Sequence, residues 1–550
     1  MSETPRTVDA VVVGAGFAGM YAHHRFRELG LTVQGFEVAS DVGGTWWWNR
    51  YPGARCDVES MDYSYGFSPE LEQEWTWSER YATQPEILRY ANHVADRFDL
   101  RRDVAFETRV TSAHWDDRAC RWDVTTDRGH HVRAQFLVMA VGCLSAAKQP
   151  ELDGIDTFRG PRYHTGRWPH DGVDFTGLRV GVIGTGSSGI QSIPLIAQQA
   201  AHVTVFQRTP NFTMPAKNGP LSREAITQRK ARAREHRDAM RVSHAGVIVT
   251  PPQESALAVD DDAREARFDA AWESGTLFGM VGAFNDLLVN RDANETAAEY
   301  VRRRIRTIVE DPEVAERLSP RNHALGTKRP CLDTDYYATY NRPNVALVDV
   351  RATPIVAITP AGVRTSEREY ALDALVFATG FDAMTGPLLG VDITGRDGRS
   401  LREKWAAGPR TYLGLMSAGF PNLFTVTGPG SPSVLVNMLV AIEQHVDWIA
   451  ACIAHLREHD VAAIDATPDA EDEWVDHVNQ LAGYTLFPTA NSWYMGANVP
   501  GKPRVFMPYV GGLPRYSSVC DDVAANGYRG FTLAGCSGSA GTGSAGPTSS

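Results

Sequence analysis

Two stretches of the chain share the order apolar strand, glycine-rich turn and helix, and this repeated unit constrains the fold more than any other feature. The first runs from the apolar segment VDAVVV at residues 8–13 into GAGFAG at residues 14–19. The second runs from LRVGVIG at residues 178–184 into a turn that reads GTGSSG at residues 184–189. In such a turn, glycines allow a sharp bend, a close approach of backbone amides to a pyrophosphate, and tight packing of helix on strand. The sequence therefore predicts an α/β protein with two Rossmann-like dinucleotide-binding domains.

The acidic residue after the first unit indicates which dinucleotide binds there. A second apolar segment, LTVQGFE, ends in Glu37, where a carboxylate can accept hydrogen bonds from ribose hydroxyls. A solitary glycine-rich turn of this kind is weak evidence, but the strand and the acid that follow it make it specific. We therefore predict that FAD binds the first unit, through Gly14, Gly16, Phe17, Gly19 and Glu37.

The corresponding position of the second unit carries an amide, Gln207, followed at once by Arg208 and Thr209. An acid there would repel a 2′-phosphate, whereas a guanidinium would bind it. The alternative is that Arg208 is only a solvated charge at the end of a strand. We predict NADP(H) in this unit, with hydride passing from nicotinamide to flavin. The residues assigned to it are Thr185, Gly186, Ser187, Ser188, Gly189, Gln191, Arg208 and Thr209.

The cysteines argue against one common use of two dinucleotides, the reduction of a disulfide. That reaction needs a pair of cysteines close after the first unit, and the segment there contains Cys56 alone. Dioxygen is therefore the expected electron acceptor. The seven cysteines of the chain include no C-x-x-C pair, so we expect neither a disulfide framework nor a metal site, and a reducing cytoplasmic location fits.

Three further motifs give the chain a family resemblance. They are GGTWWWNRYPGARCD at residues 43–57, FRGPRYHTGRWP at residues 158–169, and GTKRP at residues 326–330. In this order they resemble the longer fingerprint, the shorter fingerprint and the active-site arginine segment of the flavin-dependent Baeyer–Villiger monooxygenases, especially the phenylacetone and steroid monooxygenase branch. The resemblance implies an enzyme that uses NADPH and a flavin C4a-peroxide to insert one oxygen atom of O2 next to a ketone carbonyl, giving an ester or lactone. Sulfoxidation would be a plausible side activity.

The resemblance also implies a catalytic pair, Arg329 and Asp57. A guanidinium is charged at every working pH and can stabilise negative charge that develops during the reaction. Because an isolated buried cation is costly, it needs a carboxylate, and the resemblance supplies Asp57. The alternative is that the two residues form a purely structural ion pair.

The remaining site residues are likewise implied by the resemblance. Further cofactor contacts fall on Gly44, Thr45, Trp46, Trp48, Arg55, Asp57, Tyr63, Val110, Lys328, Arg329 and Trp493. Lys328 would join Arg208 on the NADP phosphate, and Trp493 would lie on a mobile loop that closes over the nicotinamide ribose. The substrate pocket would be lined by Val58, Leu144, Ser433, Val434, Leu435 and Met438, which are apolar except for the serine and suit a ketone on a hydrocarbon body. His164 is interpreted as a structural or domain-coupling residue.

The resemblance supplies the domain organisation. The FAD domain is expected at 1–142 and 381–535, and the NADP domain at 143–213 and 326–380. Residues 214–325 are rich in Arg, Glu and Ala and predict a mostly helical insertion, broken at Thr250-Pro-Pro252. The Gly/Ser-rich tail at 536–550 is expected to be disordered.

Charge and hydropathy exclude other partners. With 54 Lys and Arg against 66 Asp and Glu, the net charge is −12, so nucleic acid is not an expected partner. No apolar run approaches the roughly 20 residues that cross a bilayer. We expect no membrane and no metal, with a monomer or weak homo-oligomer acting on a small ketone and O2.

Two competing functions remain open from the sequence. A flavin-containing monooxygenase acting on nitrogen or sulfur has a similar shorter fingerprint, but ends it with an aromatic and a basic residue, whereas this chain has Trp168-Pro169. A protein that binds both nucleotides without turnover would be expected to lack the charged pair, and Asp57 and Arg329 are both present.

Overall fold

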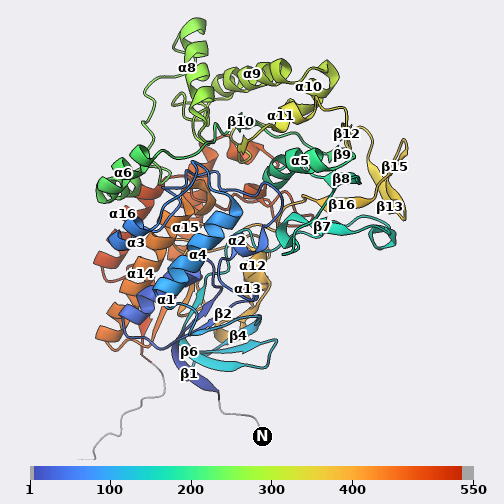
Figure 1. Ribbon diagram of the computed structural model, residues 1–550. Helices are drawn as coiled ribbons and strands as arrows, with labels where there is room; N and C mark the ends of the chain where they lie inside the picture. The colour runs from blue at the N-terminus through green and yellow to red at the C-terminus, as the bar shows by residue number, and fades with distance from the viewer. Residues whose placement is uncertain (1–4, 536–550) are drawn as a thin grey trace, which may run out of the picture.

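The computed structural model describes residues 5–535 of the chain (Figure 1), so the tail predicted to be disordered lies outside the described residues. The first glycine turn belongs to a sheet with strand order β17-β4-β5-β6-β1-β2-β3, and β18 pairs with β6 beyond this path. Strand β1 lies between β6 and β2, parallel to both, while β4, β5 and β6 form an antiparallel meander. The strands are β1 (Arg6–Val13), β2 (Val33–Phe36), β3 (Val104–Ala105), β4 (Val110–Asp116), β5 (Arg121–Thr126), β6 (His131–Met139), β17 (Asp392–Thr394) and β18 (Leu423–Thr425).

Helices from both ends of the chain cover this sheet. Helix α1 (Phe17–Glu28) follows the glycine turn and packs against α14 (Met438–Glu458), more than 400 residues later. Their apolar sides share one hydrophobic core, which includes Phe26 and Ile449. The other helices of this part are α2 (Thr45–Trp48), α3 (Pro69–Glu74), α4 (Gln84–Arg97), α12 (Gly386–Leu389), α13 (Leu401–Lys404), α15 (Pro468–Gly483) and α16 (Leu513–Ala525); an antiparallel pair joins β19 (Ala463–Ala466) and β20 (Phe531–Ala534).

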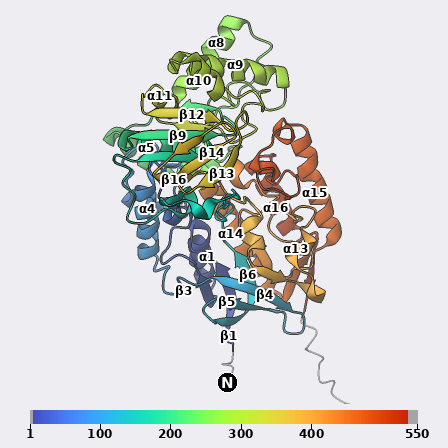
Figure 2. The ribbon, with the colours of Figure 1, turned by 90° about the vertical axis from the view of Figure 1, so that its right-hand side faces the viewer.

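The second glycine turn belongs to a separate sheet of five parallel strands, in the order β12-β9-β8-β16-β7. Figure 2 shows this sheet above the first one. Its elements are β7 (Arg162–His164), β8 (Arg179–Ile183), α5 (Ser187–Gln199), β9 (His202–Gln207), α11 (Tyr336–Thr339), β12 (Val345–Asp349) and β16 (Ala374–Phe377). A small antiparallel sheet, β13 (Ile355–Thr359), β14 (Gly362–Thr365) and β15 (Glu369–Ala371), precedes β16.

The segment between β9 and β12 of the second sheet is mostly helical, as predicted. It contains α6 (Arg223–Ala231), α7 (Ala233–Arg241), α8 (Asp261–Ser274), α9 (Arg291–Ile308) and α10 (Pro312–Leu318), and the expected break falls between α7 and α8. The segment leaves and returns through two parallel strands, β10 (Thr213–Pro215) and β11 (Cys331–Asp333), which pair with each other. The α/β fold with two Rossmann-like units and a helical insertion is therefore confirmed, whereas the domain boundaries stay a prediction.

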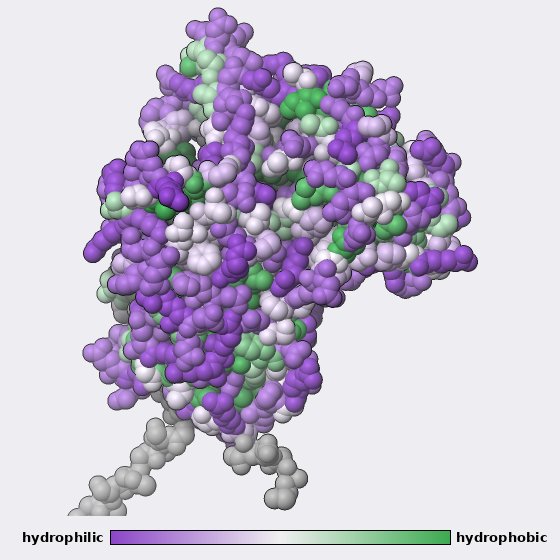
Figure 3. All heavy atoms as spheres, viewed as in Figure 1, coloured by the Kyte–Doolittle hydropathy of each residue, from purple (hydrophilic) through white to green (hydrophobic). Residues whose placement is uncertain are grey.

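Short 3-10 turns complete the described secondary structure. They are η1 (Ile155–Thr157), η2 (Thr165–Arg167), η3 (Arg396–Gly398), η4 (Ser433–Leu435), η5 (Phe487–Thr489) and η6 (Trp493–Met495). The surface in Figure 3 is mostly hydrophilic, with hydrophobic residues in small scattered groups. Within residues 5–535, no helix has both the length and the apolar character needed to cross a membrane.

Candidate functional site

The first glycine turn leaves the beginning of α1 open to an anion. Gly14 has φ +105°, and a Cβ there would lie 2.5 Å from the carbonyl oxygen of Ala140, so only glycine fits. A Cβ on Gly19 would lie 1.8 Å from the Gly14 oxygen, which explains how α1 packs so close to β1. Gly16 caps α1 without a side chain, and the first turn of the helix contains no acidic residue. The free amides of this helix start therefore suit a pyrophosphate.

Glu37 is buried at the end of β2, with 6% of its surface exposed. Its carboxylate accepts hydrogen bonds from the backbone amides of Ala15 (2.7 Å) and Ala39 (2.8 Å). Burial raises the pKa of Glu37, and these two amides act in the opposite direction. The carboxylate thus holds the glycine turn in place at the point where the sequence predicts a ribose.

The loop that begins the longer fingerprint covers the first turn. A Cβ on Gly44 would lie 2.8 Å from the Cα of Gly16, so the two backbones touch through their glycines. Thr45, Trp46 and Trp48 follow in the short helix α2, and the Trp46 indole donates to the Tyr63 hydroxyl at 3.2 Å.

Phe17 and Val110, also predicted to contact the cofactor, are both buried in this domain. The ring of Phe17 packs edge to face on Tyr63, with centroids 6.0 Å apart. Val110 is buried in the core at the start of β4. Phe17 therefore packs on Tyr63, the hydrogen-bond partner of Trp46, and the Val110 side chain faces the core.

The second glycine turn repeats the backbone of the first but stays uncovered. Gly184 has φ +112° and a Cβ there would meet the Ala378 oxygen at 2.4 Å, while a Cβ on Gly189 would meet the Gly184 oxygen at 2.3 Å. A Cβ on Gly186, by contrast, would find no heavy atom within 4 Å. Helix α5 starts at Ser187 with neither a capping side chain nor an acidic residue in its first turn. A second nucleotide phosphate therefore fits here, on an open face.

Positive charge gathers beside this second turn. Arg208 is exposed at the end of β9, and Thr209 accepts a hydrogen bond from the Thr185 hydroxyl through its carbonyl (2.9 Å). Burial, and then the charge of Arg208, lower the pKa of Lys328 to about 8. The Lys328 ammonium donates to the Asn491 carbonyl at 2.7 Å. The structure thus brings the two predicted phosphate-binding cations together without a carboxylate partner among the described residues.

The fingerprint loop then connects the first fold to α5 of the second. The Tyr51 hydroxyl donates to the Gln191 side chain at 2.8 Å, and Gln191 donates to the Arg55 carbonyl at 3.2 Å. Ser188 also hydrogen-bonds to Tyr51. Arg55 itself pairs with Glu79 at 3.3 Å. Arg55, Ser188 and Gln191 therefore take part in the junction between the two nucleotide-binding folds.

At the end of this loop, Asp57 meets Arg329 across the junction. The guanidinium donates two hydrogen bonds, each 2.8 Å, to the two carboxylate oxygens, and a third to the Val434 carbonyl at 2.8 Å. The side chains are 23% and 22% exposed, so the pair is mostly buried yet accessible. Burial works against the charged form, but Asp57 holds the pKa of Arg329 well above its usual value. The geometry is that of a permanently charged, fixed cation.

Sequence reasoning missed two partners of Arg329. One is the Val434 carbonyl, and the other is Tyr494, which hydrogen-bonds to Arg329 and whose pKa is raised to about 12 by burial, against the lowering effect of Arg329. No local pattern marks a backbone carbonyl, and Tyr494 stands out only as the neighbour of Trp493.

The predicted pocket residues mostly share one apolar cluster. Its buried members include Val434 and Tyr494, and Leu144, Leu435, Met438 and Trp493 pack against it. Val58 belongs instead to the core of the first sheet. Ser433 is fully buried with the unusual φ of +43°, and its hydroxyl donates to the Thr427 carbonyl at 3.0 Å. The pocket assignment itself stays a prediction.

The shorter fingerprint runs through β7, the strand at one edge of the second sheet. The Nε2 atom of His164 is 3.1 Å from the Lys148 carbonyl oxygen, and its Nδ1 atom accepts the Gly166 amide at 3.0 Å. Trp168 is buried in the core of the second fold. His164 thus makes structural contacts within the second fold, and its interpretation as a domain-coupling residue stays a prediction.

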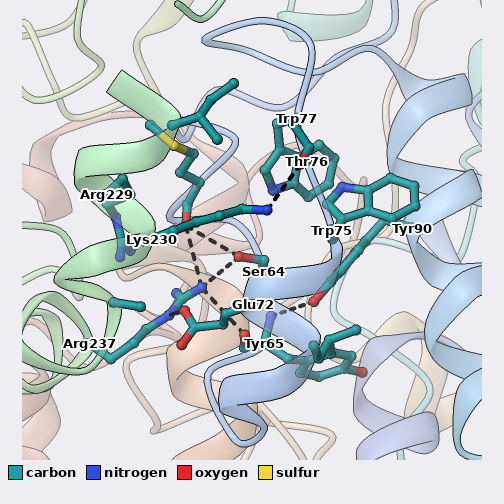
Figure 4. A pocket seen from close by; sticks show the side chains of 14 residues that line it. Ser64, Tyr65, Glu72, Trp75, Thr76, Trp77, Tyr90, Arg229, Lys230 and Arg237 are labelled. Carbon is teal, nitrogen blue, oxygen red and sulfur yellow. Dashed lines mark hydrogen bonds and ion pairs between the residues drawn. The ribbon is translucent and has the colours of Figure 1, made fainter. Parts of the chain in front are cut away.

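Two cavities lie away from the charged pair. The first, about 40 Å³, separates α3 and α4 from the insertion helices α6 and α7 (Figure 4). There the buried Arg237 binds Glu72 at 2.6 Å and Ser64 at 2.6 Å, which fastens the insertion to the first domain. The second cavity, about 150 Å³, has Pro429, Gly430 and Trp474 among its lining residues.

A metal centre has no candidate among the described residues, since they contain no group of three or more His, Cys, Asp or Glu side chains that could hold an ion. The expectation that the protein needs no metal stays a prediction.

Comparison with known proteins extends these observations. Residues 11–262 match a family described as pyridine nucleotide-disulphide oxidoreductase. A solved structure of oxidized steroid monooxygenase bound to NADP is 56% identical, with a TM-score of 0.92 and coverage of 96% of this chain and 99% of that one. OTEMO in complex with FAD and NADP is 41% identical, with a TM-score of 0.93 and coverage of 96% and 100%.

Two curated relatives match over nearly their whole lengths. A Baeyer–Villiger monooxygenase of Pseudooceanicola batsensis is 44% identical over 96% of this chain and 97% of its own. A phenazine N-monooxygenase of Lysobacter antibioticus is 42% identical over 96% and 97%. With the three fingerprint segments and the fold, these matches show that the chain belongs to the family of the Baeyer–Villiger monooxygenases.

Proposed function

We propose that the protein is an NADPH-dependent flavoprotein monooxygenase that inserts one oxygen atom of O2 beside a ketone carbonyl, giving an ester or lactone. The observation that carries the proposal is the Asp57–Arg329 pair, which lies where the two nucleotide-binding folds meet and contacts the apolar cluster through Val434. The solved structures with FAD and NADP support the choice of both cofactors.

The first fold would hold FAD. The bare α1 start would bind the pyrophosphate, Glu37 would bind the ribose, and the loop of Gly44, Thr45, Trp46 and Trp48, with Tyr63 bonded to Trp46, would cover the nucleotide. The second fold would hold NADP(H), with the α5 start on the pyrophosphate and Arg208 and Lys328 on the 2′-phosphate. When bound, these groups supply hydride transfer and the activation of O2.

The chain's own residues would contribute to the reaction through electrostatic stabilisation and through the shape of the site. Asp57 holds the Arg329 guanidinium by two bonds, so the cation is oriented before any negative charge develops and needs no reorganisation during the reaction. Leu144, Leu435 and Met438 present an apolar wall that binds a hydrocarbon body and excludes water. Trp493, next to Tyr494 with ring centroids 4.3 Å apart, would close the nicotinamide side.

Oxygen transfer to a ring nitrogen is the second candidate, because a phenazine N-monooxygenase matches at 42% identity. Trp168-Pro169 in the shorter fingerprint favours the ketone reaction. We further propose a domain division at 1–142 and 381–535 for FAD, and 143–213 and 326–380 for NADP. The protein would act without metal, as a monomer or weak homo-oligomer, in the cytoplasm.

The test is a substrate panel with the FAD-loaded protein under ¹⁸O2. The expected result is NADPH oxidation matched by O2 uptake, with one labelled atom in the ester formed from an aliphatic, cyclic or aryl ketone. Labelled N-oxide from phenazine-type amines, with no ester from any ketone, would favour the second candidate. NADPH oxidation that is not stimulated by either class would contradict both.

A further inference from the structure

Lys148 lies on the segment between the two folds, and its backbone is fixed at three points. Its amide donates to the Gly380 carbonyl at 2.9 Å. Its carbonyl accepts a hydrogen bond from the Thr379 hydroxyl at 3.0 Å and lies 3.1 Å from Nε2 of His164. Thr379 and Gly380 follow β16 after one residue, Ala378, so the end of this strand determines where the Lys148 side chain begins.

The proton of His164 can be assigned from its partners. Because Nδ1 accepts the Gly166 amide, the ring proton is on Nε2, which then donates to the Lys148 carbonyl. Burial lowers the pKa of His164, so the ring is neutral at pH 7. The single histidine of the shorter fingerprint therefore acts as a fixed donor that positions Lys148.

The backbone that holds Lys148 lies beside the second glycine turn, because the carbonyl of Ala378, directly before Thr379, would be 2.4 Å from a Cβ on Gly184. The Lys148 side chain brings a third cation to this region, close enough to respond to the charge of Arg208. Burial lowers its pKa, and Arg208 lowers it further, just as Arg208 lowers the pKa of Lys328. Of the acids that act on Lys148, Glu151 and Asp382, the second is already paired with Lys502 at 2.5 Å. The ammonium donates to a carbonyl, that of Asn498, at 2.5 Å.

Arg208 thus repels both lysines, and none of these three cations forms an ion pair with a carboxylate among residues 5–535. Arg208, Lys148 and Lys328 come from three different segments, so no local helix or turn requires them to be neighbours. Such an arrangement is unfavourable in the free protein and becomes favourable when a dianion lies between the charges. A phosphate monoester carries close to two negative charges at pH 7.

We propose that Lys148 is a further contact of the NADP 2′-phosphate, positioned by His164. The inference rests on the proposed NADP site and adds to it a residue outside the glycine turn, the strand end and the GTKRP segment. It also gives the two hydrogen bonds of the His164 ring a role, since a shift of that ring would move the Lys148 backbone.

The experiment compares nucleotides with and without the 2′-phosphate on the FAD-loaded protein. NADP⁺ and NAD⁺ are titrated while the flavin absorption spectrum is followed, and 2′,5′-ADP competes with each. For Lys148→Met, the NADP⁺ dissociation constant is expected to rise about tenfold, with little change for NAD⁺, because one charge-assisted contact is lost. Lys148→Arg is expected to restore most of the difference.

Matched variants keep the outcomes distinct. Lys217→Met removes an exposed lysine that pairs with Glu273 and should leave both constants unchanged. His164→Ala should lower the preference for NADP⁺ over NAD⁺ in the same direction as Lys148→Met, whereas a general loss of folding would release FAD as well.

Two results would overturn parts of the scheme separately. If Arg208→Ala and Lys328→Met lower the preference for NADP⁺ while Lys148→Met does not, the role of Lys148 is wrong and the NADP site stands. If none of the three changes the preference, the NADP site itself is wrong. An equal rise for NADP⁺ and NAD⁺ in Lys148→Met would also contradict the phosphate contact.

Discussion

The two glycine turns of this protein have nearly the same backbone. The first glycine of each has a positive φ, +105° at Gly14 and +112° at Gly184. At each, a Cβ would strike a carbonyl of the neighbouring strand end, Ala140 at 2.5 Å and Ala378 at 2.4 Å. The steric requirement of the turn is therefore identical, and it explains why the two units are recognisable from sequence alone.

The turns differ in what lies above and beside them. Gly16 is covered by Gly44, whereas Gly186 faces open space. Glu37 accepts two backbone amides, whereas Gln207 donates to the Arg317 carbonyl at 2.7 Å and its own oxygen has no partner among the described residues. A covered site with an acid suits a nucleotide that stays bound, and an open site with cations suits one that is exchanged.

The largest effect is expected where the two folds meet. Arg329→Ala should lower the rate of ester formation by about 10²–10³-fold or more, because a preorganised cation is removed from the reacting region. FAD should remain bound, since the first turn is untouched. The measurement is ester formed per NADPH consumed. A variant that keeps full coupling would contradict the catalytic role, and Asp57→Asn should reduce coupling in the same direction.

The next prediction compares Glu37 of the first unit with Gln207, which occupies the corresponding position of the second. Glu37→Ala leaves the Ala15 and Ala39 amides without their partner and removes the proposed ribose contact, so FAD affinity should fall by roughly 10²-fold. Gln207→Ala, its counterpart in the second fold, should leave FAD binding unchanged. Flavin retained after gel filtration gives the readout, and equal retention in both variants would break the comparison.

A smaller effect tests the charge of the open site. Arg208→Ala should raise the KM for NADPH about tenfold or more and change that for NADH little, because one phosphate contact of roughly 1.5–3 kcal/mol is lost. Steady-state kinetics with both nucleotides measure it. Equal changes in the KM values for NADPH and NADH would contradict a contact between Arg208 and the 2′-phosphate.

The smallest effect is a pH dependence confined to the second site. Lys328 has its pKa lowered from 10.5 to about 8, so the free protein loses this charge as the pH rises through 8. The contribution of Lys328 to NADP⁺ affinity should therefore be constant below about pH 7. Between pH 8 and 9 the affinity should fall severalfold, and at most about tenfold per pH unit. Lys328→Arg should remove the fall between pH 8 and 9 that is due to this lysine, while a flat profile in the unmodified protein would contradict the prediction.

The elements next to the glycines could be predicted from sequence because their constraints are local. The strand before Gly14, the helix after it and the strand that ends at Glu37 all follow from a steric rule and an apolar run. The same holds for the strand before Gly184 and for β9. The helical insertion followed from composition and helix-breaking residues.

The contacts of Arg329 could not be predicted in this way. Asp57 came from a resemblance, and the Val434 carbonyl and Tyr494 lie more than 100 residues away along the chain. A backbone carbonyl has no side-chain signature, and the placement of β17 and β18 in the first sheet depends on tertiary packing rather than on any local pattern. The same is true of Lys148, which looks like an ordinary surface lysine in the sequence.

The pairing of β18 with β6 sets an order of events on the ribosome. Strand β6 ends at Met139 and its partner β18 begins at Leu423, so the first sheet cannot be completed until the whole second fold and the insertion have been made. At about 5–20 residues per second, that interval lasts roughly a quarter of a minute to one minute. During this time the last residues of β6, from Leu137 to Met139, lack their partner on the side where β5 has ended. We expect nascent chains truncated before Leu423 to need chaperones, while the NADP-binding fold, already fully synthesised, closes first.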